Sequence, residues 1–97
     1  MTAAYIVANV TVTDPEQYKA YQQFSSRAMQ ESGARVLVRG GTTEPLEGQE
    51  PGRIVILGFP DMAAARAFYE SETYRQARKA REHAANMTMF IVEGTPE

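Results

Sequence analysis

Three side chains in the segment YESETYRQARKAREHA, residues 69–84, have the types and spacing of an anion-binding site. On an α-helix at about 100° per residue, Tyr74, Arg78 and Arg81 lie within about 60° of one another. The planar guanidinium of arginine donates paired hydrogen bonds to a carboxylate or phosphate. Because these residues lie beside an apolar alanine stripe, they are a candidate clamp for an acidic ligand at the edge of the core.

The same cations have a structural interpretation. Positive charges late in a helix complement its dipole, and Arg78 can pair with Glu82 on the surface or with a carboxylate of a second subunit. The single histidine, His83, lies off the alanine stripe and is expected to be exposed. One histidine cannot form a multi-histidine metal site within a chain, although it can serve as a haem ligand. We therefore expect no metal site and no cofactor.

Asn9 is the most informative polar residue in the predicted strands, because asparagine is poor in strands and a buried amide must find partners. A ligand in a pocket would supply such partners. A hydrogen bond to neighbouring backbone at a bulge would do so equally well. The tyrosines could send hydroxyls into the same cavity, or they form core with wet hydroxyl tips; these are Tyr5, Tyr18, Tyr21 and Tyr69.

Arg39-Gly40-Gly41 resembles a phosphate-binding loop in composition but lacks the established glycine spacings. Arg39 is kept as a ligand-binding candidate, while the glycines are expected to end a strand. The following connection, residues 40–52, is longer than a hairpin needs. Its three spaced glutamates, without an aspartate cluster, favour a solvated loop or an arm at a dimer edge over a metal site.

Composition limits the classes of function. Ten Lys and Arg against twelve Asp and Glu give a net charge of −2, which argues against a nucleic-acid binder. The absence of cysteine excludes a disulfide and a thiolate nucleophile, and it fits a reducing, cytoplasmic compartment. The first residues are expected to form a strand rather than a signal peptide, and no apolar run is long enough to span a membrane. We expect a single domain over residues 1–97.

Periodicity and capping signals predict six elements. Asp14 and Pro15 are typical of a helix start, with Gln17 placed for a capping box, and Gly33 is typical of a helix exit. Ser71 or Thr73 can restart the second helix. The predicted order is a strand over residues 3–12, a helix over about 15–31, strands over 34–41 and 53–60, a helix over about 62–85, and a strand over 87–94. This is the ferredoxin-like βαββαβ order, an α+β fold with a four-stranded antiparallel sheet and two helices on one face.

The strands carry apolar side chains on both faces of this sheet. Alternation places Ile6, Ala8 and Val10 toward the helices. The opposite face is also largely apolar, and two helices cover only one face. An uncovered apolar sheet exceeds what a monomer normally exposes, so we expect a homodimer formed through the sheet face.

With these residues placed, the chain resembles the domain of unknown function 1330 family. The matching pieces are AYIVANVTVTDPEQYKAY, VLVRGG, LEG at residues 46–48, and FPDMAAARAFYESETYRQARKAREHA. The resemblance implies a dimeric α/β barrel, a superfamily that includes small monooxygenases, lactone isomerases and haem enzymes; the family itself has no established activity. Two positions depart from the family pattern: Phe68 stands where tryptophan is common, and Pro45 interrupts a segment that usually continues as strand.

Two classes of function follow. The first is a small-molecule-binding protein or cofactor-independent enzyme with a pocket between sheet and helices for a small anionic or apolar molecule. In this class Asn9 is the polar anchor, and proton transfer or isomerisation by a tyrosine or an arginine-polarised oxyanion is the expected chemistry. The second is a non-catalytic dimerisation module whose polar residues stabilise the interface.

Overall fold

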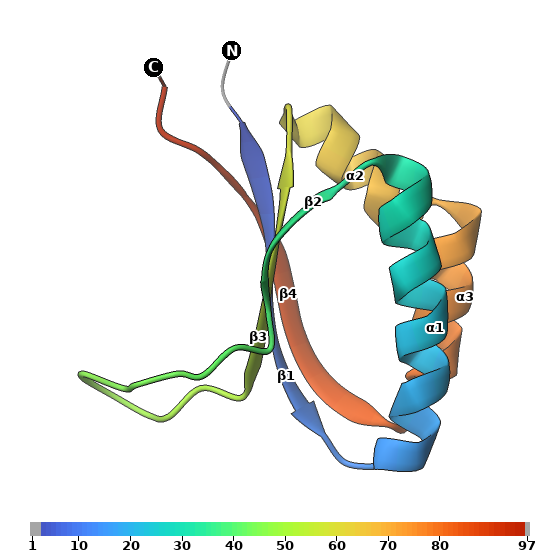
Figure 1. The fold of residues 1–97 in the computed structure, drawn as a ribbon, viewed down its shortest axis with the longest axis vertical. Helices are drawn as coiled ribbons and strands as arrows, with labels where there is room; N and C mark the ends of the chain where they lie inside the picture. The colour runs from blue at the N-terminus through green and yellow to red at the C-terminus, as the bar shows by residue number, and fades with distance from the viewer. Residues whose placement is uncertain (1–2, 97) are drawn as a thin grey trace.

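The computed structural model describes residues 3–96, in which a four-stranded antiparallel sheet carries all the helices on one face (Figure 1). The strand order across the sheet is β2-β3-β1-β4. The elements are β1 (Ala4–Val12), α1 (Pro15–Ser32), β2 (Arg35–Arg39), β3 (Arg53–Phe59), α2 (Met62–Glu70), α3 (Glu72–Ala80) and β4 (Ala85–Glu93). The ferredoxin-like α+β prediction is confirmed. Met1, Thr2 and Glu97 of the predicted domain lie outside the described residues.

Helix α1 begins and ends where its capping residues predict. The carboxylate of Asp14 accepts a hydrogen bond from the backbone N–H of Gln17 at 3.2 Å, and Gly33 ends the helix in the left-handed conformation. The predicted capping box is wrong in one respect. The side-chain amide of Gln17 does not return to the cap but donates to the carbonyl of Ala80 at 3.0 Å, which ties the start of α1 to the end of α3.

The second predicted helix is two helices, α2 and α3, separated at Ser71. Ser71 is extended, with ψ at 153°, and its hydroxyl accepts from the backbone N–H of Tyr74 at 3.2 Å as the N-cap of α3. Thr73, the other candidate, donates its hydroxyl to Glu31 of α1 instead. The helix also stops at Ala80, earlier than predicted, and His83 adopts a positive φ of 87° before β4. The break changes the helical phase, and Tyr74 points into the core.

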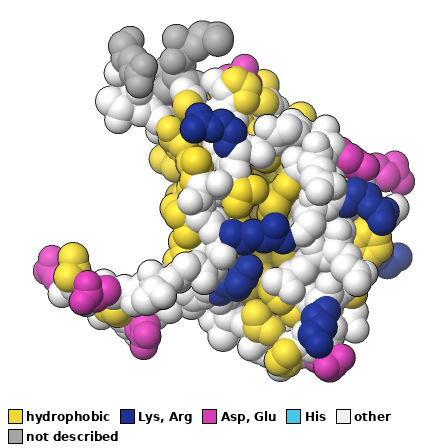
Figure 2. Space-filling view, viewed as in Figure 1, with side chains coloured by type: hydrophobic (Ala, Val, Ile, Leu, Met, Phe, Trp, Pro, Cys, Tyr) yellow, Lys and Arg dark blue, Asp and Glu magenta, His cyan; other side chains and the backbone are white. Residues whose placement is uncertain are grey.

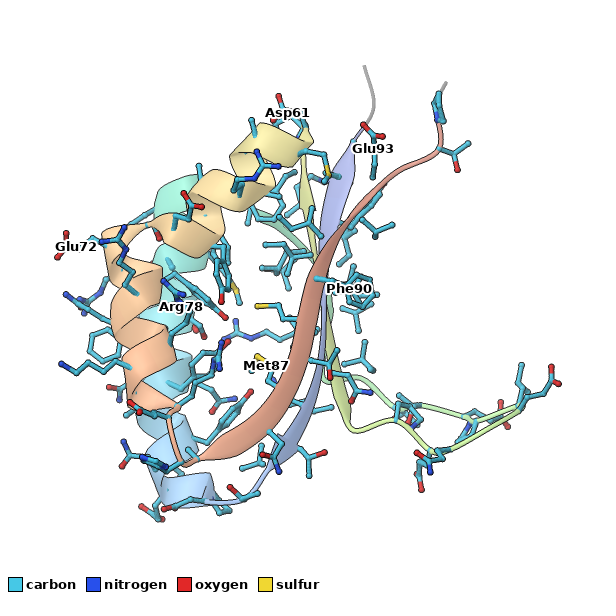
Figure 3. The ribbon with its side chains drawn as sticks, turned by 180° about the vertical axis from the view of Figure 1, so that it is seen from behind. Asp61, Glu72, Arg78, Met87, Phe90 and Glu93 are labelled. Atoms are coloured by element: carbon cyan, nitrogen blue, oxygen red, sulfur yellow. The ribbon has the colours of Figure 1, made fainter. Side chains whose placement is uncertain are left out.

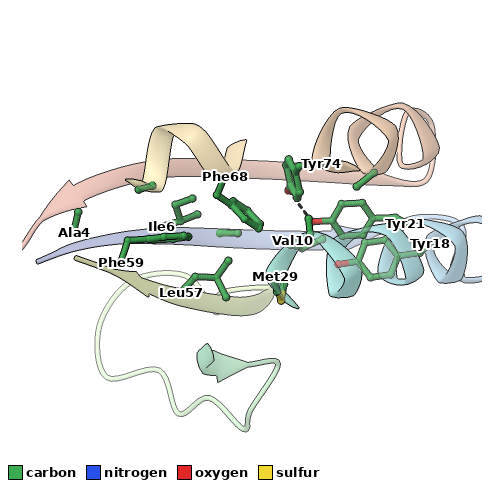
Figure 4. Close-up of a cluster of buried hydrophobic side chains, with 14 of the residues drawn as sticks. Ala4, Ile6, Val10, Tyr18, Tyr21, Met29, Leu57, Phe59, Phe68 and Tyr74 are labelled. Atoms are coloured by element: carbon green, nitrogen blue, oxygen red, sulfur yellow. Dashed lines mark hydrogen bonds between the residues drawn. The ribbon is translucent and has the colours of Figure 1, made fainter. Parts of the chain in front are cut away.

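The two faces of the sheet have the predicted assignment. Ile6, Ala8 and Val10 of β1 are buried beneath the helices, where they meet Phe68 of α2 and Tyr74 of α3 in one core (Figure 4). The opposite face, called here the outer face, carries apolar side chains that no helix covers, among them Phe90 and Val92 of β4. No helix within residues 3–96 is both long and apolar enough to cross a membrane.

The connection between β2 and β3 forms a long arm, defined here as residues 41–51. Strand β2 ends at Arg39, earlier than predicted, after a register shift between Val36 and Val38. Gly40 then adopts a φ of 71° and donates its N–H to the carbonyl of Ile54 at 2.7 Å. The arm leaves the body on the side of the sheet opposite the helices (Figure 1). Pro45 lies within it and no strand continues there.

The cap at Ser71 generates a prediction about stability. Replacing Ser71 with alanine removes the acceptor for the Tyr74 N–H, so we expect the free energy of unfolding to fall by about 1 kcal/mol. Ser71→Asp keeps a capping oxygen and should retain most of the stability. Urea denaturation followed by circular dichroism measures both. Equal loss in the two variants would show that the cap does not hold α3 in place.

Candidate functional site

A cavity lies between the inner face of the sheet and the helices. Most of its lining is apolar and comes from β1, β3, α1 and the ends of α2 and β4. The cavity has a volume of about 20 Å³, enough for about one water molecule, and the empty space around it that is partly open to solvent is about 440 Å³. Figure 2 shows hydrophobic side chains at the bottom of the hollow between sheet and helices, with Lys and Arg side chains lying across it.

One part of the cavity lining is polar and is called here the polar rim: Gln22, Ser25, Arg39 and Arg53. Arg39 is exposed, so the cavity meets solvent at this rim. The guanidinium of Arg39 in β2 donates a hydrogen bond to the hydroxyl of Ser26 in α1, which links the sheet to the helical layer. The candidate residue Arg39 therefore lines the cavity.

Arg53 is a site residue that the sequence reasoning missed. It begins β3 and pairs with Val10, so its side chain points to the same face as Val55, Leu57 and Phe59. The alternation of RIVILGFP was the signal that could have placed it on the inner face. Its guanidinium packs on Gly40, where an added Cβ would come within 2.6 Å of Cζ. Glycine at that position therefore leaves room for the arginine.

The arginines of this region lack carboxylate partners. Within residues 3–96, the pairs of opposite charge closer than 4.0 Å are Lys19 with Glu16 and His83 with Glu82. The Nε atoms of Arg53, Arg78 and Arg81 are buried and make no hydrogen bond to any described residue. Buried donors of a charged group usually have partners, and no carboxylate of the described residues supplies one to these arginines.

A tyrosine cluster forms the wall of the cavity on the helix side. The hydroxyls of Tyr21 in α1 and Tyr74 in α3 are 2.8 Å apart and hydrogen-bonded, and either can donate (Figure 4). When Tyr21 is the donor of that bond, the hydroxyl of Tyr74 donates to the sulfur of Met89 at 3.7 Å. The ring of Tyr18 lies 5.1 Å from that of Tyr21. These hydroxyls are the neutral polar groups nearest the apolar part of the cavity.

Burial moves the pKa values of these tyrosines further above neutrality. It raises the pKa of Tyr21 well above its ordinary value, and the neighbouring Tyr74 raises it further, while the positive charge of Arg81 opposes the shift. Burial also raises the pKa of Tyr74 and of Tyr18, and the charge of Arg53 opposes the shift at Tyr18. All three phenols are thus neutral hydrogen-bond donors near pH 7.

The predicted clamp of Tyr74, Arg78 and Arg81 does not have the expected geometry. Tyr74 is fully buried rather than at the core edge, because the break at Ser71 turns it inward. The guanidinium of Arg78 lies 4.4 Å from the centre of the Tyr69 ring, and that of Arg81 lies 5.8 Å from the Tyr21 ring. Neither arginine lines the cavity, although Figure 3 shows Arg78 and Met87 on the two sides of the same gap.

Asn9 is not the polar anchor of this cavity. It is exposed on the outer face, and its side-chain oxygen accepts from the backbone N–H of Gly52 at 2.8 Å. This is the backbone alternative that the sequence left open. The bond holds the end of the arm against β1, and glycine is required at position 52 because an added Cβ would clash with the backbone oxygen of Val10.

The remaining candidates do not gather into a metal centre. The side chain of His83 is 91% exposed, and the loop glutamates Glu44, Glu47 and Glu50 are also exposed on the arm. Among the described residues, no group of three or more His, Cys, Asp or Glu side chains is placed to hold a metal ion.

Comparison with known families identifies the chain. The sequence profile of the family described as Domain of unknown function (DUF1330) matches residues 3–95. The chain belongs to this family. No curated protein matches the sequence of this DUF1330 member.

Solved structures share its fold at low sequence identity. A protein of unknown function from Rhodopseudomonas palustris superposes with a TM-score of 0.75 and 20% identity, covering 99% of this chain and 85% of that one. SnoaB, a cofactor-independent oxygenase from Streptomyces nogalater, gives a TM-score of 0.63 and 11% identity, covering 100% and 97%. An ethyl tert-butyl ether D family protein from Bacillus halodurans gives 0.60 and 13%, covering 98% and 100%. At these identities the likenesses show a shared fold, a four-stranded antiparallel sheet with helices.

The raised pKa of Tyr21 generates a prediction about alkaline stability. An unfolded phenol titrates near pH 10, so above that pH unfolding releases a proton that the native state retains. The contribution of such a tyrosine to the free energy of unfolding is therefore fully present below pH 10. It falls as the pH rises further, by up to about 1.4 kcal/mol per pH unit for each such tyrosine. Tyr21→Phe removes one of these protons, so its stability should fall less steeply.

Urea denaturation of both proteins between pH 7 and pH 11 measures this difference. Between pH 7 and pH 9 the free energies of unfolding of the wild-type protein and of Tyr21→Phe should differ by a constant amount. Tyr21 does not titrate in that range in either the native or the unfolded state. Parallel curves above pH 10 would contradict the assignment of a raised pKa to Tyr21.

Proposed function

We propose that this DUF1330 protein is a homodimer that binds a small apolar molecule in the cavity between sheet and helices. The observation that supports this proposal is the cavity itself. Its lining from β1, β3 and α1 is apolar and is interrupted by tyrosine hydroxyls and by the polar rim. Ligand pockets typically combine an apolar wall with a few polar groups that fix orientation. An ordinary packed core would not place two arginines at the edge of such a space.

The dimensions of the cavity require side chains to move when a ligand enters. A volume of about 20 Å³ is too small for any organic molecule, so a ligand enters only if the wall of the cavity moves outward. Met87 and Met89 line the cavity and are half-buried. Methionine has three rotatable bonds and repacks easily, so these residues are the part of the wall that yields.

The polar groups suit a reaction that develops negative charge on oxygen. A neutral phenol of Tyr21 or Tyr74 would donate to such an oxygen in place of its present hydrogen bond, and the nearby cation of Arg81 adds positive potential. Such a site stabilises an enolate or a phenolate better than its neutral precursor. A cofactor-independent enzyme is the version of the proposal that this chemistry favours, and the fold of the cofactor-independent oxygenase SnoaB is consistent with it.

The second part of the proposal is the dimer, formed through the outer face. Phe90 is 51% exposed and Val92 is 44% exposed, and Figure 3 shows Phe90 on the face away from the helices. Leu37 of β2 is also largely exposed, beside Tyr5 and Gly58. A second copy of the sheet would remove these side chains from water. The arm leaves the body on the same side, with Leu46 89% exposed, so it would lie against the partner.

A non-catalytic dimerisation module remains the alternative. The hydrogen bond of Asn9 favours this alternative, because it gives Asn9 a structural role. The bond from Gly52 to Asn9 stabilises the base of the arm and faces no cavity between sheet and helices. That alternative needs only the outer face. Ligand binding in the cavity therefore distinguishes the two.

Filling the cavity tests the binding proposal. Ala8 is 3% exposed and lines the cavity, so Ala8→Val should occupy its 20 Å³ and reduce affinity for the neutral probe 4-ethylbenzamide at least tenfold. Overpacking is expected to cost about 1–3 kcal/mol of stability. Ala63→Val, on the exposed side of α2, is the matched control. Isothermal titration calorimetry measures binding, and a wild-type protein that binds no probe would favour the dimerisation module.

A charge on the outer face tests the dimer. Phe90→Lys would bury a cation between two apolar sheets, so we expect a monomer by native mass spectrometry at low micromolar concentration. Gln23→Lys places the same charge on the exposed side of α1 and should leave the dimer intact. A dimer that persists in Phe90→Lys would contradict this interface.

A further inference from the structure

We propose that Arg39 and Arg53 form a carboxylate-binding subsite at the polar rim, and that Ser26 occupies the place of the ligand on Arg39. The subsite rests on the proposed binding function and adds the class of ligand: an organic acid whose apolar body enters the cavity. Residues Tyr74, Arg78 and Arg81 take no part in this subsite.

Neighbouring strands bring Arg39 and Arg53 to the same part of the cavity lining. Arg39 of β2 is opposite Val55 of β3, and Arg53 precedes Val55 by two residues on the same face. Diagonal positions of this kind have Cβ atoms about 7–8 Å apart, within reach of long side chains. The guanidinium of Arg53 also packs on Gly40, the residue that follows Arg39. One carboxylate can therefore contact both forks.

The charge around the subsite is one-sided. The elements that face it are β2, β3 and α1, and the polar groups they supply are Gln22, Ser25, Ser26 and the hydroxyl of Tyr18. No carboxylate of the described residues lies within 4.0 Å of either arginine. Two neighbouring cations repel each other at the edge of an apolar space. An anion bound between them removes that repulsion.

The present partner of Arg39 is easily replaced. Ser26 is a neutral acceptor of one hydrogen bond, whereas a carboxylate can accept two parallel bonds from the guanidinium and also neutralises its charge. Releasing Ser26 also separates β2 from α1 at the rim, which opens the side of the cavity that meets solvent. Binding of the acid group and entry of the apolar body are thus one event.

The position of the subsite limits the shape of the ligand. The apolar lining begins directly behind the rim, with Val55 and Leu57 next to Arg53 along β3. A carboxylate attached directly to a compact apolar group fits this arrangement. Aromatic acids and short branched fatty acids have this form.

A matched pair of probes tests the subsite. 4-Ethylbenzoate and 4-ethylbenzamide share a shape but differ in charge, and isothermal titration calorimetry at pH 7.5 measures the affinity of the wild-type protein for each. We expect the acid to bind at least tenfold more tightly than the amide. Arg53→Gln and Arg39→Gln should each abolish most of that preference, and the affinity for the amide measures any loss that the two probes share.

Three further variants complete the test. Ser26→Ala frees Arg39 and should strengthen acid binding several-fold. Arg66→Gln, which removes an exposed arginine from α2, should change nothing. Arg53→Lys keeps the charge but loses the planar fork, so it should show an intermediate preference. Thermal denaturation verifies that each variant is folded, and Arg39, being exposed, provides the test if the Arg53 variants do not fold.

The outcomes separate the subsite from the function on which it rests. Equal affinity for acid and amide, unaffected by either arginine variant, would overturn the subsite and leave the binding function standing. Binding of neither probe would overturn both. An acid preference that disappears equally in Arg66→Gln would show a general charge effect and would also overturn the subsite.

Discussion

The alternation of side chains along β1 and β3 is the constraint on which the rest of this structure depends. Each strand presents apolar residues to both faces, so most inward residues form the cavity wall and the outward apolar residues need another cover. The same alternation buries Leu57 and Phe59 beneath the helices and points Arg53, the first residue of β3, toward the inner face. A shift of one residue in register would exchange the cavity wall with the outer face. The pocket and the expected dimer surface are therefore two consequences of one pattern.

The break at Ser71 is the second determinant, because it directs the tyrosines. A continuous helix over residues 62–80 would keep one phase and place Tyr74 differently relative to Phe68. With the restart at Ser71, Tyr74 reaches Tyr21 across the core, and a hydrogen bond of 2.8 Å joins α3 to α1. Burying two hydroxyls that hydrogen-bond to each other costs less free energy than burying either one without a partner. The same burial raises their pKa values further, so the packing of the helices sets the chemistry of the cavity wall.

The sequence predicted the parts of the fold that depend on local signals. Asp14, Pro15 and Gly33 bound α1 as expected, and Ile6, Ala8 and Val10 face the helices, because capping and alternation act over a few residues. The candidate site was harder to predict. Helical spacing placed Tyr74 beside Arg78 and Arg81, but the position of Tyr74 depends on the phase change at Ser71. Arg53 was overlooked as the first residue of a strand, although its face follows from Val55. The partner of Asn9 is Gly52, 43 residues along the chain, a contact that no local pattern reveals.

The uncovered outer face and the arginines of the polar rim are linked through β2. This strand is at the edge of the sheet, is only five residues long and is interrupted by a register shift, so its pairing with β3 is the weakest part of the sheet. Arg39 ends β2, and the arm begins immediately after it. A partner that packs on Leu37 and holds the arm would fix β2 from the outer side, while the bond from Arg39 to Ser26 holds it from the inner side. Loss of that inner bond when a ligand binds leaves the outer contact as the support of the strand. A dimer contact of this kind would therefore keep the rim in place while the cavity opens, and ligand affinity would depend on a surface that the ligand never touches.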